Sequence, residues 1–130
     1  MAHLRGTADE IRARVPPVLD AWQYMRDNVL REGLVEPELK RLAFRYLAED
    51  PETADFERFE GRERLVLEWA HAIAWDSDCA DDALWERLHA SFSEPELVEL
   101  GCAIGFELGR RHFLHSLGAD VGVVRASQLR

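Results

Sequence analysis

The sequence predicts an all-α protein, and three observations support this class. Apolar residues recur at helical spacing along most of the 130 residues, capping signals precede the apolar runs, and no useful stretch alternates as a strand does. Glycine and proline fall between the runs, where they begin or end helices. We therefore predict five or six helices without a sheet, in a single domain that covers residues 1–130.

The longest predicted helix covers residues 93–118, and the other helices are expected to pack around it. Ser93 and Glu96 have the spacing of a capping box at its start, and Gly118 suits the left-handed position after its end. Apolar residues fall on two nearly opposite sides of this helix. It is therefore expected to be covered on both sides and to be the most buried helix.

A row of glycines at every fourth position runs along the same helix: Gly101, Gly105 and Gly109. Each glycine costs a helix about 1 kcal/mol relative to alanine, so the row indicates that another backbone approaches closely. Charged residues such as Glu99 and Arg110 exclude a dimer of membrane-spanning helices. The glycines and the two-sided apolar pattern together predict a homo-oligomer, a dimer or larger.

The shorter helices are predicted from their periodicity and their flanking residues. A lead-in helix that Pro16 and Pro17 end is expected at 7–15, and further helices are expected at 18–31, 36–50, 62–75 and 82–91. The acidic segment 50–60 is predicted to be a connector that Phe56 and Phe59 hold against the core.

Charge and hydropathy exclude several classes of partner. The net charge of -9 disfavours nucleic acid and anionic membranes, because no basic stripe is present to bind phosphates. No apolar run approaches the roughly 18 residues of a membrane span, and the first ten residues lack a secretory pattern. We expect a cytoplasmic protein whose partners are copies of itself and a small acidic molecule.

Two cysteines, Cys79 and Cys102, stand 23 positions apart and form no CxxC motif. This spacing gives neither a disulfide framework nor a zinc site. Cys102 lies within an apolar helix and is expected to be a buried, inert thiol, whereas Cys79 in a polar loop is expected to be exposed.

Three stretches of the chain together resemble a known family: LREGLVEPELKRLAF at 30–44, GRERLVLEWAHAIAWD at 61–76 and DALWERLHASFSEPELVELGCAIGFELGRRHFLHSLG at 82–118. The chain is similar here to the carboxymuconolactone decarboxylase and AhpD-like alkylhydroperoxidase family. The resemblance implies an AhpD-like helical bundle that oligomerisation completes.

The sequence departs from the peroxidase members of that family. These members carry a CxxCxxxH motif on a helix after the segment that 30–44 resembles, together with a relay glutamate, and this chain lacks both. Arg41 stands where the resemblance places the glutamate. We therefore expect no cysteine-dependent hydroperoxidase activity and no cofactor. The decarboxylase branch does not need the cysteine pair.

Several polar residues have spacings that suit chemistry. Glu68 and His71 form an ExxH pair of the kind that builds di-iron sites, but no second pair is present, and an ion pair between Arg64 and Glu68 is the simpler interpretation. His112 and His115 suit a metal or acid–base role, or simply stabilise a helix C-terminus. These ligands are too few for a closed metal site, so we predict no bound metal.

Basic residues near the end of the long helix suit a carboxylated substrate. The guanidinium groups of Arg110 and Arg111, with His112, match the geometry of a carboxylate such as a lactone acid. The simpler interpretation is that they form salt bridges with the many acidic residues. The four tryptophans are expected to fill the core and interfaces.

The sequence leaves two functions open. The first is a helical scaffold or binding protein without peroxidase activity. The alternative is a cofactor-independent decarboxylase or isomerase of a small carboxylated substrate, with a site built from Glu68, His71, Arg111, His112 and His115. Convergence of these residues in one pocket would favour the enzyme.

Overall fold

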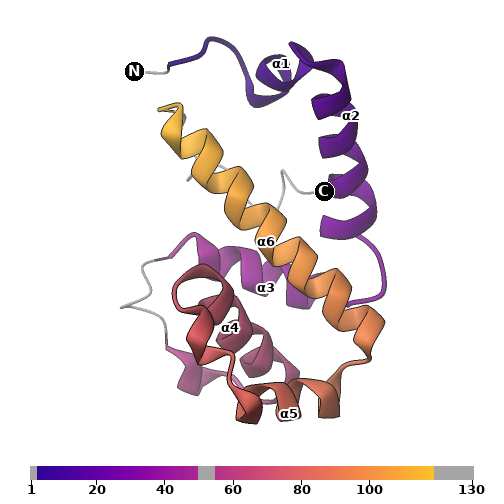
Figure 1. The fold of residues 1–130 in the computed structure, drawn as a ribbon, viewed down its shortest axis with the longest axis vertical. Helices are drawn as coiled ribbons and strands as arrows, with labels where there is room; N and C mark the ends of the chain where they lie inside the picture. The colour runs from indigo at the N-terminus through magenta and orange to yellow at the C-terminus, as the bar shows by residue number, and fades with distance from the viewer. Residues whose placement is uncertain (1–2, 50–54, 119–130) are drawn as a thin grey trace.

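The computed structural model describes residues 3–49 and 55–118, in which all regular structure is helical (Figure 1). Six α-helices follow one another: α1 (Ala8–Ala13), α2 (Pro16–Met25), α3 (Pro37–Leu47), α4 (Gly61–Ala74), α5 (Asp82–Ser91) and α6 (Glu94–Ser116). A π-helical turn, η1 (Arg26–Leu30), extends α2, and two 3-10 turns, η3 (Phe56–Arg58) and η4 (Ser77–Cys79), flank α4. The predicted all-α class is confirmed. Of the described helices, none has the length and apolar content needed to span a bilayer. Residues 50–54 of the predicted connector and the tail after Gly118 lie outside the described ranges.

Local capping signals place the helix ends near their predicted positions. Ser93 and Glu96 form the predicted capping box, with hydrogen bonds of 3.3 and 2.9 Å between each side chain and the other residue's backbone N–H. Asp81 caps α5 by accepting a hydrogen bond of 2.9 Å from a backbone N–H in the first turn. Gly118 has the expected positive φ, 77°, after the end of α6.

The second helix differs from its prediction at both ends. Pro16 and Pro17 were predicted to end the lead-in helix, but they form the first turn of α2. Backbone N–H groups in a first turn have no acceptor within the helix, so proline loses no hydrogen bond there. At its other end the α-helix becomes the π-helix η1. Gly33 then turns the chain with a φ of 130°, a conformation that other residues adopt only with strain.

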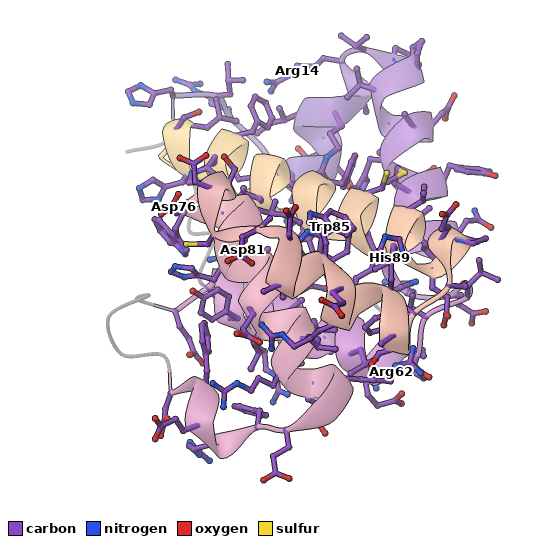
Figure 2. All side chains as sticks on the ribbon, turned by 60° about the horizontal axis from the view of Figure 1, so that its bottom comes forward. Arg14, Arg62, Asp76, Asp81, Trp85 and His89 are labelled. Carbon is purple, nitrogen blue, oxygen red and sulfur yellow. The ribbon has the colours of Figure 1, made fainter. Side chains whose placement is uncertain are left out.

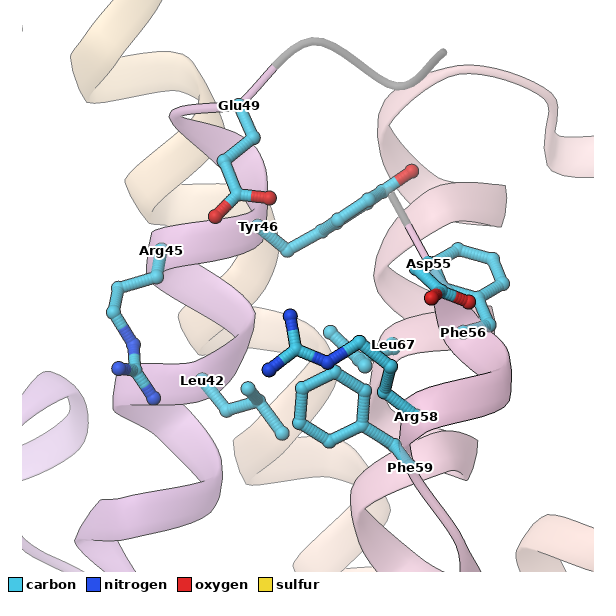
Figure 3. A pocket seen from close by; sticks show the side chains of 9 residues that line it. All are labelled: Leu42, Arg45, Tyr46, Glu49, Asp55, Phe56, Arg58, Phe59 and Leu67. Carbon is cyan, nitrogen blue, oxygen red and sulfur yellow. The ribbon is translucent and has the colours of Figure 1, made fainter. Parts of the chain in front are cut away.

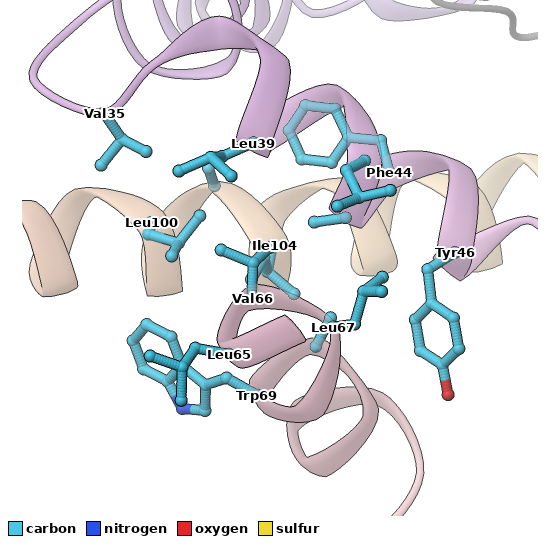
Figure 4. Packing of buried hydrophobic residues seen from close by; sticks show 14 of the residues in the cluster. Val35, Leu39, Phe44, Tyr46, Leu65, Val66, Leu67, Trp69, Leu100 and Ile104 are labelled. Carbon is cyan, nitrogen blue, oxygen red and sulfur yellow. The ribbon is translucent and has the colours of Figure 1, made fainter. Parts of the chain in front are cut away.

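Helix α6 crosses the molecule, with α1 and α2 on one side and α3, α4 and α5 on the other (Figure 1). Its fully buried Leu100 and Ile104 lie between Leu39 of α3 and Val66 of α4 (Figure 4). Each such side chain stabilises the fold by about 1.5–3 kcal/mol when it is removed from water. The main core is therefore the contact of α6 with α3 and α4.

The predicted cover on both sides of α6 is found only in part. Cys102, expected to be a buried thiol, is exposed, and this expectation is wrong. The reason is that α5 packs against α4 and leaves this stretch of α6 open. Trp85 and His89 of α5, both labelled in Figure 2, line a groove between α5 and α6 beside Cys102. Cys79 is exposed, as predicted.

A fully buried lysine joins three segments of the chain. The Nζ atom of Lys40 donates hydrogen bonds to the carbonyl oxygens of Val29, at 2.6 Å, and Glu32, at 2.7 Å, and lies 3.1 Å from a carboxylate oxygen of Glu99. Glu99 also accepts hydrogen bonds from the backbone N–H groups of residues 34–35. Because all three ammonium protons have acceptors, the cost of burying the charge is offset.

The glycines of α6 have two different surroundings. A Cβ atom at Gly101 would lie only 2.9 Å from Cη2 of Trp69, so the tryptophan occupies the space that a side chain would need. At Gly105 and Gly109, an added Cβ atom would meet no described atom within 4 Å. Within the described chain, the close neighbour at the glycine row is thus a side chain rather than another backbone.

Alanine substitutions should separate these two surroundings. We expect Gly105→Ala to raise the free energy of unfolding by about 0.5–1 kcal/mol, because alanine favours the helix and enters open space. The same change at Gly101 should lower it, because overlap with Trp69 costs about 1–3 kcal/mol. Urea unfolding followed by circular dichroism measures both. Equal effects at the two positions would contradict this packing.

The buried pair of Lys40 and Glu99 also predicts that the free energy of unfolding depends on pH. Burial alone would raise the pKa of Glu99, but the backbone N–H groups and Lys40 outweigh burial and lower that pKa. Glu99 therefore stabilises the fold above the pKa of the unfolded carboxyl group, about 4.3, and this contribution is lost as the pH falls through the lowered folded pKa. We expect Glu99→Gln to cost about 3 kcal/mol at pH 7 and progressively less below pH ~4.

Urea unfolding of both proteins from pH 7 to pH 3 tests this expectation. Glu38→Gln is the matched control, because Glu38 is exposed and, among the described residues, pairs only with Arg41 at the surface of α3. If Glu99→Gln lowered the free energy of unfolding equally at every pH, the ionised carboxylate would not be the stabilising group.

Candidate functional site

A groove of about 520 Å³ lies between the α1–α2 segment and α6. It is lined by aromatic and aliphatic side chains, by two glycines and by two arginines: Arg12, Pro17, Val18, Ala21, Trp22, Gly105, Phe106, Gly109, Arg110 and Phe113. This volume is within the range of about 300–1,000 Å³ that small-molecule sites occupy.

The groove forms because large side chains hold α2 against α6 beside a strip of α6 that carries no side chains. The rings of Trp22 and Phe106 stack with centroids 5.9 Å apart and an angle of 10° between their planes. Gly105 and Gly109 leave the neighbouring surface of α6 bare. The apolar rim remains partly open to water, since Phe113 keeps 47% of its surface exposed.

Arg12 of α1 is buried at this groove, with 8% of its side chain exposed. Its Nη1 atom donates a hydrogen bond of 3.0 Å to Asp9, and its guanidinium carbon lies 4.2 Å from the centroid of a Trp22 ring. Burial lowers the pKa of Arg12, and the hydrogen bond to Asp9 only partly opposes this effect. Stacking on the indole fixes the plane of the guanidinium group.

A second arginine at the groove is held by a buried carboxylate. Arg110 donates two hydrogen bonds to Glu107, from Nε at 2.8 Å and from Nη2 at 2.5 Å, and both side chains are buried. The neighbouring Arg111 is half-buried. Burial lowers the pKa of Arg111, and Glu107 is the carboxylate that opposes this shift.

Each arginine that lines the groove pairs with one carboxylate, Arg12 with Asp9 and Arg110 with Glu107. The pairing of Arg12 is the weaker of the two, because it consists of one hydrogen bond and Asp9 is exposed to water. An anion bound at Arg12 would form charge-assisted hydrogen bonds with the donors that Asp9 does not use.

Glu68 and His71, predicted as a pair on α4, turn toward different helices. The Glu68 carboxylate accepts hydrogen bonds from Arg87 of α5, at 2.8 and 3.3 Å, and the predicted pair with Arg64 is present at 3.9 Å. His71 Nδ1 instead lies 2.6 Å from the hydroxyl oxygen of Tyr46 on α3. The two side chains therefore do not share a site.

Tyr46 borders a small cavity of about 150 Å³ between α3 and the η3–α4 segment (Figure 3). Arg45 and Arg58 contribute positive charges to its lining, and Glu49 and Asp55 contribute matching negative charges. Phe56 and Phe59 also line it and pack against the core, which confirms their predicted anchoring role: both are partly buried against the core cluster. The cavity is well below the size of a typical ligand site.

The predicted residues on α6 lie near its C-terminal end. His112 and His115 are exposed, and Arg111 is half-buried. Within the described residues, the groove lining includes Arg110 but none of Glu68, His71, Arg111, His112 or His115. The part of the chain that the structure describes contains no cluster of three or more His, Cys, Asp or Glu side chains suited to a metal ion.

The sequence interpretation gave no role to Arg12, and it assigned Trp22, with the other tryptophans, to the core and interfaces. A weak signal was present in the spacing of Asp9 and Arg12, which is typical of an ion pair within one helix. Nothing in that spacing indicates that the arginine is buried against Trp22, because the contact depends on the turn between α1 and α2.

The chain matches no protein-family model, no curated protein and no solved structure. Its function is therefore inferred from the chemistry of the groove.

The Glu107–Arg110 pair should be essential to the groove. We expect Glu107→Gln to lower the free energy of unfolding by about 3–5 kcal/mol, because it leaves the buried Arg110 charge without its carboxylate. Adding Arg110→Met to this variant should restore part of the loss, since no buried charge then remains unpaired. Urea unfolding of the natural protein, both single variants and the double variant measures the coupling. Additive effects of the two changes would contradict a coupled pair.

Proposed function

We propose that the protein binds a small, largely apolar molecule with an acidic group in the groove between α2 and α6. The observation that supports this function is the presence of two buried arginines, Arg12 and Arg110, in the wall of an otherwise apolar groove. A carboxylate matches the planar donor array of arginine, and an apolar body would displace water from the aromatic walls.

Binding is favoured over catalysis by the composition of the lining. Among the described residues that line the groove, none is His, Asp, Glu or Cys. Arginine remains protonated at neutral pH and is a poor proton donor or acceptor, so the lining can hold a ligand but has no group suited to transfer a proton. The proposal therefore favours a binding protein over the decarboxylase or isomerase alternative.

The cysteines also fit a protein without peroxidase activity. The thiol of Cys79 donates a hydrogen bond of 3.3 Å to Asp76, and this interaction is the main cause that raises the pKa of Cys79. A raised pKa leaves less of the reactive thiolate at neutral pH. In this proposal neither cysteine takes part in ligand binding, because neither is among the described residues that line the groove between α2 and α6.

Displacement of a fluorescent probe tests the function. N-phenyl-1-naphthylamine is neutral and fluoresces in apolar sites, and decanoate is an amphipathic carboxylate. We expect the probe to bind the natural protein and decanoate to displace it. Gly105→Leu should abolish both, because a leucine side chain fills the groove from a position with free space around it.

Ala83→Leu is the matched control, since it adds the same apolar side chain at an exposed position of α5. Equal probe binding by Gly105→Leu and Ala83→Leu would overturn the proposal. Light scattering on each variant identifies another occupant of the groove. If Gly105→Leu converts a dimer to a monomer while decanoate leaves the probe bound, the groove is an interface between two copies and the proposal is wrong.

A further inference from the structure

Arg12 differs from Arg110, the other arginine that lines the groove as described, in how many of its donors are used. Arg110 is held by two hydrogen bonds to Glu107. Arg12 has five N–H donors, and among the described residues only Asp9 accepts from it, through Nη1. An arginine whose side chain is more than nine-tenths buried thus keeps most of its donors without a protein acceptor among the described residues, at the wall of the groove.

The position of Arg12 fixes where an acidic group would bind. Its guanidinium group is stacked on Trp22, and Trp22 in turn stacks on Phe106. Because one flat face of the guanidinium group lies on the Trp22 ring, its hydrogen bonds are directed along its edges. The bare strip at Gly105 and Gly109 provides the adjoining apolar surface.

We propose that Arg12 binds the carboxylate of an amphipathic monocarboxylate ligand, whose apolar body lies along the Gly105–Gly109 strip of α6. This inference rests on the proposed function and adds the residue that selects an acid over a neutral molecule of the same shape. It also gives α1 a role, since this six-residue helix carries the anchoring residue. A single acidic group is specified because, of the two arginines that line the groove, only Arg12 lacks a carboxylate held by two hydrogen bonds among the described residues.

The test compares decanoate with decan-1-ol, which has the same chain and no charge, in displacing N-phenyl-1-naphthylamine. We expect Arg12→Gln to weaken decanoate about tenfold to hundredfold, the loss of a charge-assisted carboxylate contact, and to change decanol less than about twofold. Arg14→Gln is the matched control. It removes the same charge from the residue that follows α1, where the side chain is exposed.

A second variant protects the test if Arg12→Gln fails to fold. Asp9→Asn removes the competing carboxylate from Arg12 at an exposed position, so decanoate should bind several-fold more tightly while decanol is unchanged. Decanoate affinity that is unchanged in both Arg12→Gln and Asp9→Asn would overturn the role of Arg12 and leave the proposed function standing. Failure of the natural protein to bind either compound would overturn the proposed function itself, and this inference with it.

Discussion

The ammonium group of Lys40 is fully removed from water, so it persists in the interior only because three acceptors surround it. Two of these acceptors are carbonyl oxygens at and just after the end of η1, where a helix leaves C=O groups without partners. The third is Glu99 of α6, which also binds the backbone of the next loop. One side chain of α3 thus fixes both where the second helix ends and how α6 lies across α3.

The groove follows from this arrangement. With the end of the second helix held by Lys40, α1 and α2 lie on the side of α6 away from α4 (Figure 1). The contact across that side is made by the stacked rings of Trp22 and Phe106, because Gly105 and Gly109 offer no side chains. The fold therefore has a dense core on one side of α6 and an open, aromatic surface with arginines on the other.

The helices could be predicted because their signals act over a few residues, as the capping box of Ser93 and Glu96 does. The buried charges could not be predicted in this way. Lys40 has the helical spacing of a surface residue, and its carboxylate partner lies on another helix. The same limit applies to Cys102, whose exposure depends on where α5 packs, and to Arg12, whose burial depends on Trp22. Sequence periodicity gives the faces of each helix, whereas the partner of each face is decided by the tertiary arrangement.

The overall charge of the chain adds a constraint on the ligand. A net charge of -9 repels anions at long range, so it does not attract a small acid such as acetate toward the groove. The positive charge of Arg12 acts strongly only at short distance, after water has been displaced from the groove beside Arg12 and Trp22. Removal of that water needs an apolar body that covers the aromatic surface. In the proposed function, charge repulsion and apolar contact thus act together, and we expect the groove to discriminate against acids that lack an apolar body and against apolar molecules that lack an acid.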